Sequence, residues 1–135
     1  LSMELSQETI KRVERISFLS PDYRLIALRS SPSTQQEALL KATALNDFSQ
    51  FTPKTLMGSA LSEAFTTSRV PYSVTALMEQ HKLGETILTA IIQFEKGSAG
   101  DMQDLIDSIA TLRLVGLEET ARRAALYLLI IQNYD

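Results

Sequence analysis

The segment that most constrains the fold is the run of eight residues from Ala124 to Ile131, in which no side chain carries a charge. It follows a stretch with four charged residues, Glu118, Glu119, Arg122 and Arg123. The spacing predicts one helix over about 117–131 that is amphipathic at its start and apolar on every side at its end. Such a helix is normally buried by neighbours on several sides. Leu128 and Ile131 therefore need a cover, which either the helices of the first half or another chain must supply.

Helical patterns also dominate the rest of the chain, and no alternating run bounded by hairpin turns competes with them. Further helices are expected over 4–18, 21–29, 33–46, 53–66, 72–81, 85–95 and 101–115. N-caps are predicted at Ser20, Ser33, Thr52 and Asp101. Lys82-Leu83-Gly84 predicts a break between two helices, and Gly97-Ser98-Ala99-Gly100 predicts a loop that ends with glycine. The expected fold is all-α, with seven or eight helices packed as antiparallel hairpins, like a helical repeat or a bundle.

Several of these helices have an apolar face. Residues at helical spacing are expected to share one face of the first helix: Met3, Ile10, Val13 and Ile16 or Ser17. Four residues of the helix over 85–95 are expected to point inward: Ile87, Ala90, Ile91 and Phe94. In the last helix, the pairs Glu118–Arg122 and Glu119–Arg123 have the orientation that favours i, i+4 ion pairs.

The composition limits the class of protein. The 135 residues fit a single domain over 1–135, with possible halves at 1–69 and 70–135, the second made of two helical hairpins. A net charge of -3 argues against a nucleic-acid partner. The absence of cysteine excludes disulfides and thiolate chemistry, and leaves cytoplasmic and periplasmic locations both open. No apolar run reaches the roughly 20 residues of a membrane span.

No residue spacing predicts a catalytic, metal or cofactor site. His81 is the one histidine, and we expect it to be exposed near a helix end. Asp101, Asp104 and Asp107 have the i, i+3 spacing of a cation site, but acids in a first helical turn are common without a ligand. The loop at 97–100 lacks the strand and the Lys-Ser/Thr pair of a phosphate loop. We therefore predict no catalytic residue, no metal and no cofactor.

The second half shows signs of an internal repeat. Residues 72–100 match 106–134 at an offset of 34, with five identities that include Thr86 on Thr120 and Ala90 on Ala124. The phrase LRLVGLEETARRAALYLL resembles the closing helix pair of tetratricopeptide-like α-helical repeat regions in bacterial proteins. The resemblance covers about 20 residues, and the chain lacks the tryptophan of the tetratricopeptide signature. It implies a scaffold of helical hairpins.

These features predict a protein-interaction or scaffolding domain, as part of a larger bacterial protein, which binds another protein or its own copy. Partner-binding residues are expected in two places, Phe48 and Phe51 in one, and Leu128 and Ile131 of the last helix in the other. The first two lie in a predicted connection, where their rings need a docking place. Together with Phe65, Tyr72, Tyr127 and Tyr134 they could instead fill the core or form an aromatic groove. The alternative function is a small-ligand or enzymatic domain with a polar pocket, for which two convergent carboxylates of raised pKa would be the sign.

Overall fold

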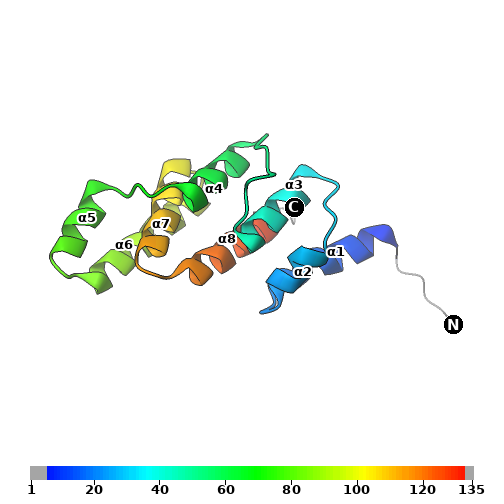
Figure 1. The fold of residues 1–135 in the computed structure, drawn as a ribbon, viewed down its shortest axis with the longest axis horizontal. Helices are drawn as coiled ribbons and strands as arrows, with labels where there is room; N and C mark the ends of the chain where they lie inside the picture. The colour runs from blue at the N-terminus through cyan, green and yellow to red at the C-terminus, as the bar shows by residue number, and fades with distance from the viewer. Residues whose placement is uncertain (1–5, 133–135) are drawn as a thin grey trace.

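Eight α-helices make up the part of the chain that the computed structural model describes, residues 6–132 (Figure 1). They are α1 (Gln7–Ser17), α2 (Tyr23–Arg29), α3 (Gln35–Leu45), α4 (Leu56–Thr66), α5 (Tyr72–Glu79), α6 (Leu83–Ser98), α7 (Met102–Leu114) and α8 (Glu118–Gln132). No strand occurs among these residues, so the all-α prediction is confirmed. Met3 and Tyr134 lie outside the described residues.

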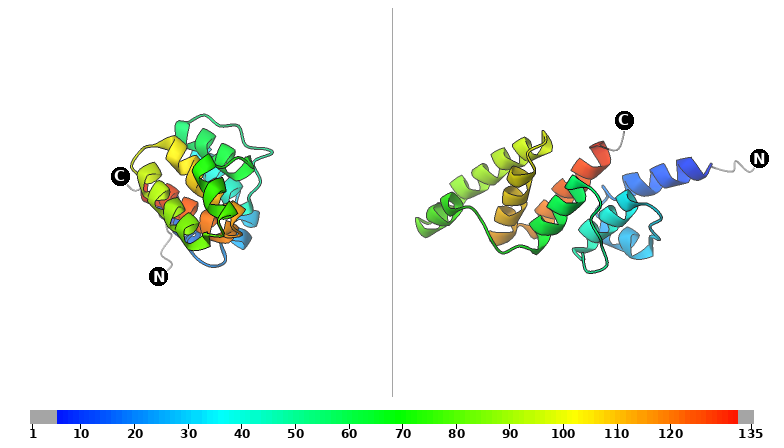
Figure 2. Two further views of the ribbon diagram at one scale, coloured as in Figure 1. Left: turned by 90° about the vertical axis from the view of Figure 1, so that its left-hand side faces the viewer. Right: turned by 90° about the horizontal axis from the view of Figure 1, so that it is seen from above.

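The helices form an elongated array, with α5 and α6 at one end and α1 and α2 at the other (Figures 1 and 2). The most extensive contact joins α6 to α7, which follow each other in the chain. Two other contacts join distant segments: α4 packs on α7, and α3 packs on α8. Helices of the first half therefore cover helices of the second half. This is one of the two ways of covering α8 that the sequence left open, the other being a second chain.

The apolar end of α8 is buried mainly by this arrangement. Leu128 is only 7% exposed, and Leu126, Leu129 and Ile130 are also buried. Ile131 remains 47% exposed. The buried residues belong to one apolar cluster with members from both halves, from Phe18 to Ile130. None of the helices in 6–132 combines the length and hydropathy that crossing a membrane requires.

The helix beginnings follow local capping chemistry, in part at other residues than predicted. Asp101 caps α7 as expected, since its side chain accepts a hydrogen bond from the Asp104 N–H at 3.0 Å. The other three predicted N-caps are wrong. The N-caps of α2, α3 and α4 are Asp22, Thr34 and Thr55. At α3 and α4 the capping hydroxyl stands one and three residues further on: Thr34 accepts from the Glu37 N–H at 3.1 Å, and Thr55 accepts from the Gly58 N–H at 2.9 Å.

Four helix ends share one backbone motif. A residue with left-handed backbone follows α3, α5, α6 and α7: Asn46, His81, Gly100 and Gly116. At each, the next N–H donates to a carbonyl five residues back, for example Lys82 N to Leu77 O at 2.9 Å. The predicted break at Lys82-Leu83-Gly84 is therefore displaced. His81 makes the turn, while Leu83 and Gly84 belong to α6.

Gly97 is a contact residue of α6 and not, as predicted, part of a loop. A Cβ atom built on Gly97 would lie 2.6 Å from Leu105 Cα and 2.7 Å from Leu105 N. Only glycine allows the backbones of α6 and α7 to approach this closely. By contrast, a Cβ atom on Gly84 would meet no atom within 4 Å.

Positions of α6 and α8 correspond at an interval of 35 residues rather than 34, whereas α5 and α7 begin 30 residues apart, at Tyr72 and Met102. His81 and Gly116 both have left-handed backbone, and they lie 35 residues apart. The buried pair Thr86 and Ala90 corresponds in the same way to the buried Ala121 and Ala125. At the offset of 34, buried Thr86 is instead matched with exposed Thr120. The sequence identities at that offset therefore do not mark equivalent positions.

Candidate protein-interaction surface

Large apolar side chains remain exposed on α1, α6 and α8. On these three helices they are Ile10, Val13, Ile16 and the following Leu19 at α1, Leu83, Leu88, Ile91 and Ile92 on α6, and Tyr127 and Ile131 on α8. Other helices also expose large apolar residues: Leu25, Leu28, Leu56, Tyr72 and Leu114. Ile91 was expected to point inward, and this expectation is wrong. Ala90 takes the innermost position of α6, with no exposed surface. Clustered apolar exposure of this kind typically marks an interaction site.

A groove joins these three helices. It is lined by Phe18 and Leu19 after α1, Phe94 on α6, and Thr120, Arg123, Ala124 and Tyr127 on α8. Tyr127 is 57% exposed, and Ile131 lies one helical turn further along the same face of α8. Apart from Arg123, the lining side chains carry no charge, so the groove suits an apolar ligand surface.

Helix α1 contacts α3 and the residues before it through polar side chains. Lys11 Nζ lies 3.2 Å from Glu37 Oε1 and 3.0 Å from Ser33 Oγ, and Arg15 Nη2 lies 3.4 Å from Gln36 Oε1. A helix turns about 100° per residue, so Val13, midway between Lys11 and Arg15, points to the opposite side. No residue of α1 is buried. The apolar stripe predicted from the sequence therefore exists, but it faces away from the protein.

The two arginines of α8 have different environments. Arg122 Nη2 pairs with Glu118 Oε1 at 3.1 Å, as predicted, and Asn46 Nδ2 donates to the same oxygen. The second predicted pair is wrong, because no ion pair joins Glu119 and Arg123 within the described residues. Arg123 is exposed and lines the groove. Among residues 6–132 it forms no ion pair, and it is the one charged residue of the groove lining.

The four predicted partner-binding residues fall into different environments. Phe48 is 9% exposed, and its ring stacks on Phe65 and contacts Phe51 edge-on, both at 5.9 Å between centroids. Leu128 is buried in the core. Phe51 lies in the connection between α3 and α4 and lines a separate hollow beside α3. None of the four lines the groove between α1, α6 and α8; Ile131 lies one helical turn beyond its lining residue Tyr127.

Sequence reasoning missed Tyr127 and Arg123 as surface residues of this groove. The sequence leaves Tyr127 open between the core and an aromatic groove, and it predicts an ion pair for Arg123. The only available signal was the i, i+4 spacing of Arg123, Tyr127 and Ile131 on one face of the helix. That spacing does not reveal whether the face is buried or exposed.

A polar cleft between α1 and α3 tests the enzymatic alternative. Its lining includes Glu8, Lys11, Arg15 and Glu37. The backbone N–H of Ser33, its hydroxyl and Lys11 stabilise the ionised carboxylate and hold the pKa of Glu37 below its usual value, against a smaller opposing effect of burial. The cleft therefore presents a carboxylate of lowered pKa, the opposite of the sign expected for a general acid.

The other residues considered for chemistry have structural roles. His81 is exposed at the turn after α5. Asp101 caps α7, and Asp107 accepts a hydrogen bond from Gln103 Nε2 at 3.0 Å. Across residues 6–132, no group of three or more acidic or histidine side chains is placed to hold a metal ion. These positions give no support to a metal-dependent reaction.

No protein-family model, curated protein or solved structure matches this chain. The resemblance to tetratricopeptide-like repeats gains no support from these comparisons. The function must therefore be argued from the arrangement of side chains.

Proposed function

We propose that this chain is a non-catalytic protein-interaction domain that binds a helical segment in the groove between α1, α6 and α8. One observation carries the proposal: a groove between α6, α8 and the end of α1 is lined by the exposed apolar side chains of Leu19 and Tyr127, by Phe18 and Phe94, and by a single charged residue, Arg123. An amphipathic helix recognises such a groove through apolar residues at i, i+3 and i+4.

The geometry of α6 and α8 supports this proposal. At the interval of 35 residues, exposed Leu88 and Ile92 on α6 correspond to exposed Arg123 and Tyr127 on α8. The outer faces of the two hairpins thus present their side chains in the same register. A repeat-like array that presents equivalent faces along one side is the usual construction of a scaffold that binds extended partners.

Site-specific photo-crosslinking tests the proposal. A photoreactive phenylalanine analogue replaces Tyr127 at the groove in one variant and Tyr72 on α5 in the control. Both tyrosines are exposed, at 57% and 84%, so neither replacement disturbs the core. After irradiation in the source cells, we expect crosslinked protein adducts from position 127 and few or none from position 72.

Two further variants make the result specific. Ile131→Glu, beside the groove, should abolish the crosslinks from position 127, whereas Leu56→Glu on α4 should not. Ile131 and Leu56 are both exposed aliphatic residues, so the two substitutions are chemically matched. Equal crosslinking at positions 127 and 72, or none at either, would contradict a binding role for the groove. Phe48→Ala is unsuited to the test, since it removes a core ring and would change stability.

A further inference from the structure

We infer that the groove is filled by α1 of a second copy of this chain, so that two copies form a symmetric dimer. This inference rests on the proposed function and names its partner. It starts from the orientation of α1, which directs its polar side at α3 and its apolar stripe, Ile10, Val13 and Ile16, to the outside. A monomer would leave all three side chains 42–58% exposed to water.

Each copy carries both the inserting helix α1 and the groove, and the two surfaces adjoin each other on the chain. Phe18 and Leu19, which directly follow α1, form one wall of the groove. A twofold axis near this point would place the α1 stripe of each copy over the groove of the other. In such an interface the same patch serves both copies, as is usual for homodimers.

The charges on the two surfaces are complementary. Glu14 lies at the edge of the apolar stripe, one turn from Ile10, and also lines the polar cleft between α1 and α3. Its carboxylate forms no ion pair within the described residues, whereas Glu8 pairs with Arg12 at 2.8 Å. Arg123 is the unpaired charge of the groove. When the stripe of one copy enters the groove of the other, Glu14 and Arg123 are the free opposite charges at the contact, and the symmetry gives two such pairs. Charges of this kind set the register of an interface more than its affinity.

The apolar area is sufficient for a dimer. Six half-exposed side chains take part on each copy: Ile10, Val13, Ile16, Leu19, Tyr127 and Ile131. At roughly 80 Å² each they supply about 500 Å² of apolar surface per copy. A standard interface buries about 800 Å² per partner, of which roughly 60% is apolar, or about 480 Å². The two areas agree.

A lipid surface fits the same stripe less well. Interfacial helices direct basic side chains to the membrane plane beside their apolar face. In α1, however, Lys11 pairs with Glu37, Arg12 with Glu8, and Arg15 contacts Gln36. These contacts hold the basic groups on the protein itself.

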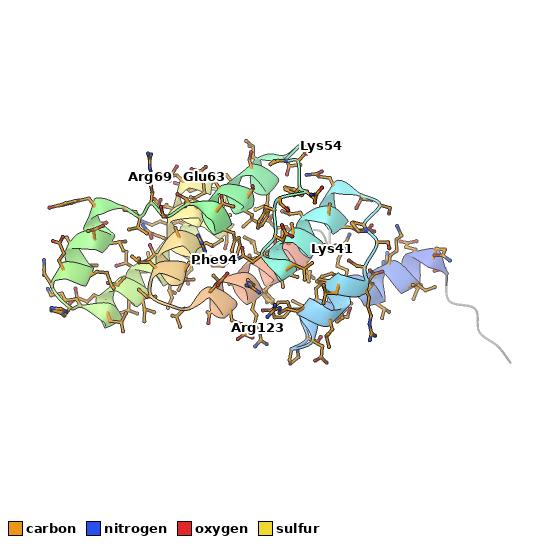
Figure 3. All side chains as sticks on the ribbon, in the orientation of Figure 1. Lys41, Lys54, Glu63, Arg69, Phe94 and Arg123 are labelled. Carbon is orange, nitrogen blue, oxygen red and sulfur yellow. The ribbon has the colours of Figure 1, made fainter. Side chains whose placement is uncertain are left out.

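Sedimentation equilibrium of the full 135-residue chain from about 1 to 500 µM tests the inference, since interfaces of this size span micromolar and tighter affinities. We expect a monomer–dimer equilibrium. Arg123→Glu and Glu14→Arg should each weaken it by roughly tenfold, and the double variant should recover most of the loss. Val13→Glu should abolish dimers. The matched control is Arg69→Glu, on the opposite edge of the molecule from Arg123 (Figure 3), which should change nothing.

The outcomes separate this inference from the proposed function. Circular dichroism melts of each variant should match the unsubstituted chain at concentrations where that chain is monomeric, because Glu14, Val13 and Arg123 are exposed; above them the unsubstituted chain should melt at the higher temperature. A monomer at every concentration would overturn the inference, as would a dimer insensitive to Val13→Glu or to the charge exchange. Flotation with anionic vesicles that is lost on Val13→Glu would also overturn it. In each of these cases the proposed function stands if position 127 still crosslinks to another protein, and fails if it does not.

Discussion

Replacing Gly97 with alanine should destabilise the fold although alanine is the better helix former. The added Cβ atom would lie 2.6–2.7 Å from three atoms of Leu105, two of them backbone atoms. Carbon atoms normally approach to 3.5–4.0 Å, so α6 and α7 would have to separate by about 1 Å. Leu105 and Ile109 of α7 are fully buried, so this shift would disturb the most extensive helix contact of the molecule.

The net effect is the difference between two terms. Overpacking at a rigid contact costs about 3 kcal/mol, at the upper end of the usual range, because backbone atoms cannot move aside. Removing a glycine from a helix contributes about 0.5–1 kcal/mol in the other direction. We therefore expect Gly97→Ala to lower the free energy of unfolding by about 2 kcal/mol.

Gly84→Ala is the matched control, since it is the same substitution in the same helix with no atom within 4 Å of the new Cβ. It should raise the free energy of unfolding by about 0.5 kcal/mol. Urea unfolding followed by circular dichroism at 222 nm measures both variants. If Gly97→Ala were as stable as Gly84→Ala, the close approach of α6 and α7 at Leu105 would be refuted.

Three further substitutions test other parts of the fold. His81→Gly should raise the free energy of unfolding by about 1 kcal/mol, because the left-handed backbone of His81 favours glycine, and a lower urea midpoint would contradict this. Arg113→Ala should lower the free energy of unfolding by about 1–3 kcal/mol, because the Arg113 guanidinium donates to the Ala64 and Thr67 carbonyls at 3.0 and 2.8 Å. Thermal melts that match those of the unsubstituted chain would exclude this role. Because the pKa of Glu37 is lowered in the folded state, its carboxylate contributes to the free energy of unfolding above its usual pKa of 4.5. This contribution is lost as the pH falls through the lower pKa of the folded state. Glu37→Gln should remove this part of the acid dependence, by less than about 1 kcal/mol, and urea midpoints at pH 6 and pH 3 that shift equally in both proteins would refute it.

The sequence determined the helices but only some of their limits. Periodic apolar residues predicted all eight, and Asp101 was correctly identified as a cap because its side chain acts within three residues. The sequence also showed that the end of α8 needs a cover. These are properties of local chain geometry, which depends on neighbours along the sequence.

Only the tertiary structure decided which helix faces are buried and which glycine lies at a close contact between two helices. Periodicity places Ile10, Val13 and Ile16 on one side of α1, but it does not reveal that α3 holds the opposite, polar side. Likewise, Gly84 and Gly97 are equally plausible helix breaks by composition, yet only Gly97 lies against another backbone. Contacts between distant segments, α4 with α7 and α3 with α8, determine these roles, because burial depends on which residues meet in space.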